Sequence, residues 1–258
     1  MKEIGELFSA SLLANEERGR DATGVASIDR HGAVRIKKGP QPASQFVKTE
    51  EYSAFMENLE KNEISVLLGH TRRPTKGSPR ENDNNHPIMV GDTVGIHNGT
   101  ITNDDEIFLS MEKRRDKTRK RIGSVDSEAI FALMDEVDLT EPFGKWANGI
   151  KTVASLLVGS YTTLFFNKAF PHMLFLLKYD NPISVHYCSD LNALFFSSRY
   201  VFLRKAFGKS VIAEALPSKT GYVYDATLLK QKQKEPAIQF GLSQLKKQYP
   251  KSDKESTG

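Results

Sequence analysis

Cysteine is nearly absent from this sequence, because Cys188 is the only one among 258 residues. A single cysteine excludes an intramolecular disulfide and a cysteine-based zinc cluster. It is typical of a protein from a reducing compartment, so we expect a cytoplasmic location. No apolar run reaches the roughly 18–20 residues that span a bilayer, and the opening MKEIGELFSASLL is too acidic for a signal peptide. We therefore expect no membrane association.

An excess of one charge is also missing, since the formal net charge is only +4, and this does not by itself imply nucleic acid. One segment departs from that balance. It holds seven basic residues, namely Lys113, Arg114, Arg115, Lys117, Arg119, Lys120 and Arg121. We interpret it as a solvated loop or helix end, and an anion patch that binds phosphate or nucleic acid remains the alternative. The segment has no aromatic residues for base stacking, which disfavours single-stranded nucleic acid as a ligand.

Hydrophobic periodicity indicates one α+β domain over residues 1–229. Helices are expected over 6–17, 43–61 and 126–137, and strands over 22–29, 33–39, 64–71, 92–99, 160–166, 172–179, 183–188, 193–198 and 221–226. The late strands follow one another while helices gather in the middle, which favours separate layers over alternating βαβ units. Residues 230–258 are expected to form a polar tail, with the last ten residues disordered.

Five short motifs occur in one order along the chain. They are RGRDATGVA (18–26), GHTRRPTKG (69–77), HPI (86–88), IHNGTITN (96–103) and DSE (126–128). With GSYTTLFF (159–166) and CSDLNAL (188–194), they make residues 7–226 resemble the class II glutamine amidotransferase domain. Relatives in that family include the glutaminase domains of glucosamine-6-phosphate synthase and amidophosphoribosyltransferase. The resemblance implies an N-terminal-nucleophile (Ntn) hydrolase fold, a four-layer αββα sandwich of two antiparallel sheets flanked by helices.

The resemblance also implies a pocket for glutamine that needs no cofactor and no metal. Arg72 would grip the α-carboxylate through its planar guanidinium, and Asp126 would accept hydrogen bonds from the α-ammonium. Thr75 and His86 would line the same pocket. An ordinary ion pair between Arg72 and Asp126 is the alternative for those two residues. His86, with two other histidines, also fits a hydrogen-bonded scaffold better than a metal site, because no carboxylate or cysteine completes a ligand set.

Asn98 and the backbone N–H of Gly99 would form the oxyanion hole in this resemblance. A hairpin turn is the alternative for this Asn-Gly pair. Arg18, Gly19 and Asp21 would form a structural turn behind the nucleophile.

The nucleophile itself is missing from the sequence. In the family, a cysteine that follows the initiator methionine attacks the glutamine amide, and its own α-amine is the base. Here residue 2 is lysine, and the family's first strand is absent, so about seven residues are expected to be missing ahead of Met1. Cys188 lies in a late strand with its amine in a peptide bond. The family's aromatic residue after the arginine is replaced by Arg73, followed by Pro74, and Lys76 is also unusual, so we expect a more positive pocket rim.

Three interpretations remain open. In the first, the sequence is a truncated glutaminase that supplies ammonia to a synthase on a partner chain. In the second, it is a catalytically inactive relative that binds glutamine, a related amino acid or another protein. In the third, the 113–121 segment makes it a phosphate or nucleic-acid binder, which we consider least favoured.

Overall fold

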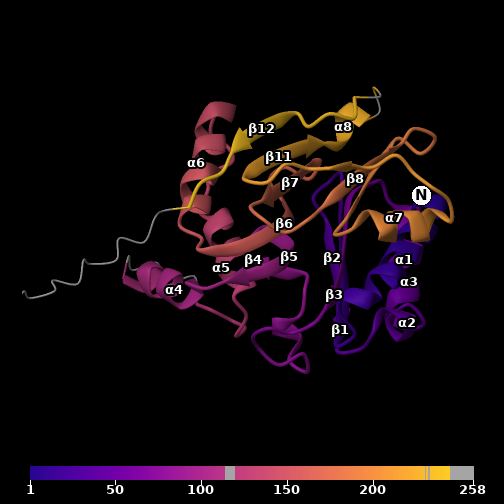
Figure 1. The fold of residues 1–258 in the computed structure, drawn as a ribbon, viewed down its shortest axis with the longest axis horizontal. Coiled ribbons are helices and arrows are strands. Elements are labelled where there is room, and N and C mark those ends of the chain that lie inside the picture. The colour runs from indigo at the N-terminus through magenta and orange to yellow at the C-terminus, as the bar shows by residue number, and fades with distance from the viewer. Residues whose placement is uncertain (114–119, 230, 232, 245–258) are drawn as a thin grey trace, which may run out of the picture.

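A computed structural model describes residues 1–113, 120–229, 231 and 233–244 (Figure 1). The helices are α1 (Lys2–Asn15), α2 (Ala43–Phe46), α3 (Glu50–Lys61), α4 (Asp104–Lys113), α5 (Ser127–Asp135), α6 (Phe143–Ser155), α7 (Tyr200–Phe207) and α8 (Ala226–Leu229), with 3₁₀ turns at Glu16–Arg18 and Asn82–Asn84. None of the described helices combines the length and the apolar character that crossing a bilayer requires.

The strands form two layers that pack face to face. They are β1 (Ala22–Asp29), β2 (Val34–Gly39), β3 (Ile64–Arg72), β4 (Ile88–Val90), β5 (Thr93–Ile101), β6 (Gly159–Asn167), β7 (Met173–Lys178), β8 (Ser184–Cys188), β9 (Ala193–Ser197), β10 (Glu214–Ala215), β11 (Thr220–Asp225) and β12 (Ile238–Gly241). One layer is a six-stranded antiparallel sheet in the order β12-β11-β7-β6-β5-β4. Helices α4, α5 and α6 lie on one side of this sheet, at the opposite end of the molecule from α1, α2, α3 and α7 (Figure 1).

The second layer consists of two three-stranded antiparallel sheets, β2-β1-β3 and β10-β8-β9. Both pack on the other face of the large sheet. Leu68 of β3 shares a core cluster with Leu164 of β6, and the rings of Phe196 and Tyr224 lie 5.1 Å apart. Helices α1 and α3 cover the outside of β1 and β3. The αββα architecture is therefore confirmed, with the difference that its second sheet is divided in two.

Close packing of α5 on the large sheet fixes the start of that helix. Gly95 faces the Phe131 ring so closely that a Cβ on Gly95 would lie 2.1 Å from Phe131 Cε1. Alanine or any larger residue would displace the helix. Because Asp126 directly precedes α5, this contact also sets the position of Asp126 relative to β5.

Two local predictions need correction. The helix expected over 43–61 is interrupted, because the Thr49 hydroxyl caps a new helix by accepting a hydrogen bond from the Tyr52 N–H at 3.2 Å. The tail expected from residue 230 contains β12, which pairs with β11 at the edge of the large sheet. Ile238 and Phe240 alternate with outward-facing residues, a pattern too short to stand out in a polar stretch. The last ten residues lie outside the described part of the chain.

Leu242, just after β12, is buried in the core against α6, so it tests whether this segment belongs to the domain. We expect Leu242→Ala to lower the free energy of unfolding by about 2–4 kcal/mol, because it leaves a cavity in a packed core. Urea titration measures this value. Gln239→Ala, an exposed position on β12, is the matched control and should change little. Equal stabilities of the two variants would show that the segment is a tail after all.

Candidate functional site

Three segments far apart in sequence meet at one edge of the sandwich. They are the end of β3 with Arg72, the β5 segment with Asn98 and Gly99, and the residue before α5, Asp126. Strands β3 and β5 come from different layers and contact each other. Four of the six residues that the sequence predicts for the glutamine pocket and the oxyanion hole are therefore carried by neighbouring elements.

Arg72 is buried, with 4% of its surface exposed, and it holds the loop that follows β3. Its guanidinium donates to Asn85 Oδ1 at 2.8 Å and to the backbone carbonyls of Lys76 and Gly77 at 2.5 and 3.0 Å. Burial lowers the pKa of Arg72, while the negative charges of Asp126 and a second aspartate oppose this shift. Since a guanidinium has five N–H donors, two of them remain for a ligand.

Asp126 is also buried, and it accepts a hydrogen bond from the Ile101 N–H at 2.7 Å. Burial raises the pKa of Asp126, and this hydrogen bond partly offsets the increase. Arg72 and Asp126 attract each other, yet the structure shows no ion pair between these two described residues. The simple Arg72–Asp126 salt bridge, which was the alternative from the sequence, is therefore not formed in the structure. The two opposite charges attract each other without direct contact.

The Asn98 side chain is oriented by Arg18, whose Nη2 donates to Asn98 Oδ1 at 3.1 Å. Arginine can only donate, so this contact settles which end of the amide is oxygen. The amide nitrogen Nδ2 then points elsewhere, and it is buried with no partner among the described residues. Asn181, which the sequence reading missed, fixes the same residue by donating to the Asn98 carbonyl at 2.7 Å. An unused, preoriented donor is what an oxyanion hole requires.

Two glycines allow the backbones to approach closely here. Gly99 has φ of +147°, and a Cβ would lie 2.0 Å from the Ser160 carbonyl oxygen, so only glycine fits. A Cβ on Gly19 would lie 2.2 Å from the carbonyl carbon of Arg72. Asp21 continues this contact by donating its N–H to the Arg72 carbonyl at 3.1 Å. The Arg18–Asp21 turn thus lies directly against Arg72 and Asn98.

Three histidines lie close together near the site, with His86 and His97 buried and His70 half-buried. The ring centroids of His70 and His86 lie 4.3 Å apart, and those of His86 and His97 lie 6.4 Å apart. His70 Nε2 donates to the His97 carbonyl at 3.0 Å, and His97 Nδ1 contacts Ser127 Oγ at 2.8 Å. Both ring nitrogens of His86 have no partner in the described structure. Burial lowers the pKa of His70 and His97 to about 3 and lowers that of His86 well below its usual value. All three are therefore neutral at pH 7.

A cavity of about 570 Å³ also borders Asn98. It touches eight consecutive residues of the β3 segment, 64–71, and eight consecutive residues around β9, 191–198. Because side chains of a strand alternate between its faces, a surface that meets every residue meets the edge of the strand. No described strand pairs with either edge. The cavity is therefore a strand-shaped slot between the two halves of the second layer.

The walls of the slot are mostly apolar. Its floor is the large sheet, which contributes alternate residues such as Thr162 and Leu164, and its roof is α1, which contributes residues three or four positions apart, from Met1 to Asn15. Arg18 and Asn98 also line the slot. The two termini of α1 thus lie along the length of the slot.

Thr162 pairs with Asn98 across the two strands, and its hydroxyl donates to the Asn181 carbonyl at 2.6 Å. Cys188 ends β8, pairs with Ala193 and does not line the slot. Ser11 lines the slot, but it lies within α1. That the attacking group is missing from this chain stays a prediction.

The remaining predicted residues divide between two places. Thr75 is exposed in the loop after β3, close in sequence to Arg72. His86 lies in the histidine cluster, but neither of its ring nitrogens has a hydrogen-bond partner in the described structure, so the hydrogen bonds expected of a scaffold residue are not seen there. Of the basic segment, residues 114–119 lie outside the described structure. Arg121 does not form an open anion patch, because its guanidinium pairs with Asp104 and Asp105.

No protein-family model matches the chain. Curated relatives include a glutamine–fructose-6-phosphate aminotransferase of Sulfurisphaera tokodaii, 32% identical over 188 residues, which covers 71% of this chain and 29% of the relative. A 7-cyano-7-deazaguanine synthase of Saccharolobus solfataricus is 27% identical over 199 residues, which covers 75% of this chain and 39% of the relative. The chain therefore spans about a third of the length of these relatives.

Solved structures show the same fold. A glutamine PRPP amidotransferase from B. subtilis superposes with a TM-score of 0.69 at 16% identity, covering 93% of this chain and 47% of that chain. A glutamine aminotransferase class-II domain protein from Silicibacter pomeroyi has a TM-score of 0.53 at 13% identity, covering 87% of this chain and 97% of that chain.

The fold and these relatives define a class II glutamine amidotransferase-like domain with the Ntn-hydrolase architecture. Within that class, the chain is similar in sequence to the glutamine–fructose-6-phosphate aminotransferase of S. tokodaii and in structure to the PRPP amidotransferase of B. subtilis.

The histidine cluster predicts acid sensitivity. An unfolded histidine has a pKa of about 6.5, whereas folded His70 and His97 have pKa values of about 3 and that of His86 is also lowered. The unfolded state binds more protons between these values. The free energy of unfolding is therefore highest above pH 6.5 and falls as pH drops, by up to about 1.4 kcal/mol per pH unit for each histidine.

Removing one of these histidines should flatten the dependence. We expect His86→Gln to reduce the slope of unfolding free energy between pH 6 and 4 by about 1.4 kcal/mol per pH unit, measured by urea titration at each pH. His31→Gln removes an exposed histidine and should leave the slope unchanged. His70→Gln is the substitute if the first variant does not fold. Identical slopes in all variants would contradict the assignment.

Proposed function

We propose that this domain binds glutamine and, once a cysteine nucleophile occupies the slot, releases the amide nitrogen as ammonia. The observation that carries the proposal is the Asn98 amide, which Arg18 orients and whose nitrogen is a buried, unpartnered donor in a residue that lines the slot. A donor in this state has no structural use of its own, and it matches the negative charge that develops on an amide oxygen under attack.

The amino-acid end of glutamine fits the separated charges. Arg72 retains donors for the α-carboxylate, and Asp126 has a carboxylate for the α-ammonium. A zwitterion placed between the two would satisfy both, whereas the protein leaves them unpaired with each other. Two desolvated opposite charges are stabilised strongly by such a ligand because the local dielectric is low.

The slot explains where a nucleophile would lie. Helix α1 has 14 residues and is therefore about 21 Å long. A strand that ran back along α1 from Met1 would cover that distance in about six or seven residues at 3.3 Å each. Its first residue would then lie beside Arg18 and Asn98.

The reaction follows the family's route. The cysteine thiolate would attack the side-chain carbonyl carbon of glutamine, and Asn98 Nδ2 with the Gly99 N–H would hold the oxyanion. The α-amine of the same cysteine would take the thiol proton and pass it to the departing nitrogen. Ammonia would leave as a thioester forms, and water would then hydrolyse the thioester to glutamate.

The acceptor of the ammonia would lie outside this domain. The relatives of this chain are named for different products, one an aminotransferase of fructose-6-phosphate and another a deazaguanine synthase. A shared glutaminase-like region in proteins with different products indicates that the region is not what selects the acceptor. We therefore propose that a synthase domain or partner chain receives the ammonia.

Glutamine binding can be tested on the chain as it is. Asp126→Asn should weaken glutamine binding at least tenfold, measured by calorimetry, because the variant loses the charge that faces the α-ammonium. Binding of glutaramate, which is glutamine without its α-amino group, should not weaken. Arg72→Lys should weaken both ligands, and Arg73→Lys, at the exposed neighbour, should weaken neither. Equal effects of Asp126→Asn on both ligands would exclude the assigned orientation.

Catalysis can be tested by supplying the strand. We expect no ammonia from glutamine with the present chain, and we expect ammonia once about seven residues beginning with cysteine precede Met1. In that extended chain, Asn98→Ala should lower kcat by about 10²–10³ and leave glutamine affinity largely intact. Replacing the added cysteine with alanine is the control.

The result also separates the two main interpretations. If the extended chain binds glutamine and releases no ammonia, the domain is a non-catalytic binding module. If the unmodified chain is already active and remains active as Cys188→Ala, the proposed chemistry is wrong.

A further inference from the structure

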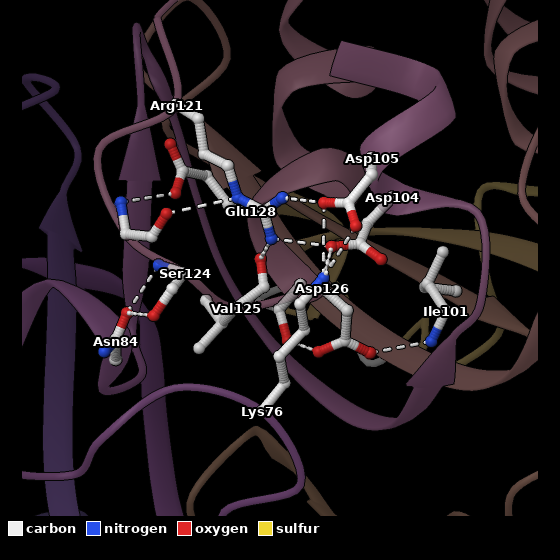
Figure 2. A network of polar contacts seen from close by, with 12 residues as sticks. Lys76, Asn84, Ile101, Asp104, Asp105, Arg121, Ser124, Val125, Asp126 and Glu128 are labelled. Carbon is white, nitrogen blue, oxygen red and sulfur yellow. Dashed lines mark hydrogen bonds and ion pairs between the residues drawn. The ribbon is translucent and has the colours of Figure 1, made fainter. Parts of the chain in front are cut away.

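Four charged residues bridge the loops that carry the amino-acid pocket. Lys76 Nζ lies 2.6 Å from Asp104 Oδ2 and 3.3 Å from Asp105 Oδ1, and Arg121 Nη2 lies 2.6 Å from Asp104 Oδ2. Arg121 Nη1 also pairs with Asp105. Figure 2 shows that the two cations come from different loops and meet the two aspartates at the start of α4. We call these four residues the clasp.

Each of the two basic residues of the clasp forms a hydrogen bond to a pocket residue or to the residue next to it in sequence. The Lys76 carbonyl accepts the hydrogen bond from Arg72 Nη2 at 2.5 Å. Arg121 Nη2 donates to the Val125 carbonyl at 3.0 Å, one residue before Asp126. The clasp therefore connects the backbone beside the carboxylate-binding arginine to the backbone beside the ammonium-binding aspartate.

Burial decides which member of the clasp matters most. The Asp104 side chain is only 6% exposed and receives both cations on one oxygen, whereas the Asp105 side chain is 71% exposed. Exposed ion pairs contribute little, but removing the charge of a buried one leaves its partners without compensation. The two cations and two anions also balance, so Lys76 does not make the pocket rim positive as the sequence suggested.

We propose that Lys76, Arg121, Asp104 and Asp105 are positioning residues that set the separation between Arg72 and Asp126 and thereby determine glutamine affinity. This inference rests on the proposed function for its ligand. It assigns a role to Arg121, which the basic segment alone left open, and to Lys76, which departs from the family's pattern.

The loop before α5 has a second anchor that does not use the clasp. Glu128 accepts hydrogen bonds from the Ile122 and Gly123 N–H groups at 2.7 and 2.8 Å, and the Asn84 side chain accepts one from the Ser124 N–H at 2.7 Å. Loss of the clasp is therefore expected to shift Asp126 locally and to leave the loop and the fold in place.

Asp104→Asn removes the central charge at almost constant shape. We expect glutamine binding to weaken about tenfold by calorimetry, with Lys76→Met giving a similar loss and the double variant little more than either alone, because both break one linkage. Lys76→Arg should restore most of the affinity. Asp92→Asn is the matched control, since Asp92 forms an exposed ion pair with Lys168 at 3.2 Å elsewhere on the molecule.

Hydrogen exchange tests the clasp without any ligand. The Ile101 N–H donates a hydrogen bond to Asp126. We expect this N–H to exchange about tenfold faster in Asp104→Asn than in the unmodified chain or in Asp92→Asn. The exchange rate of the Val223 N–H, in the core of the large sheet, should not change.

The two measurements have separate meanings. If no glutamine binds to the unmodified chain but Ile101 exchange still responds, the proposed function fails and the clasp retains its positioning role. If glutamine binds and neither affinity nor Ile101 exchange changes in Asp104→Asn, the clasp proposal is overturned. Equal acceleration at Ile101 and Val223 would mean that the fold as a whole is weakened, which also overturns it.

Discussion

The site depends on two buried opposite charges that are kept from touching. Arg72 and Asp126 would gain Coulomb energy by closing into an ion pair, and burial makes each costly to leave charged. The scaffold prevents closure by engaging both elsewhere. Backbone carbonyls and Asn85 hold the guanidinium, and the Ile101 N–H holds the carboxylate. Under the proposed function, this separation would let the zwitterionic end of glutamine contact both groups.

Rigid packing around these charges maintains that separation. Gly95 lets α5 lie against β5, and Gly19 lets the 18–21 turn lie against the Arg72 backbone. The three histidines pack near the site in their neutral form, because burial makes the protonated imidazole unfavourable at neutral pH. These contacts are close backbone or ring packing, so the core contributes to the geometry of the site together with the proposed clasp between the surrounding loops.

The slot and the pocket are two halves of one arrangement that meet at Asn98. The pocket has preorganised groups for an amino acid, and the slot has two open strand edges. Open edges in an apolar channel are a poor end state for a sheet, because their N–H and C=O groups lack partners. An added strand would pair with those groups and join the second layer into one sheet. Binding and catalysis can be tested separately, because the proposed binding residues belong to the pocket and the nucleophile would come from the added strand.

The sequence by itself determined the class of fold and supplied candidate pocket residues, whose roles remain predictions. Motif order and alternating strands are local features, and the family resemblance that they carry implied the αββα sandwich and the roles of Arg72, Asn98 and Asp126. It missed β12, because a four-residue strand in a polar stretch has too weak a pattern. It also could not show that Arg121 turns inward to Asp104, since a basic run looks the same whether it faces solvent or a carboxylate. The divided second layer, the strand-shaped slot and the clasp depend on which distant segments become neighbours. Only the tertiary structure decided those features, because their contacts join residues that no local period relates.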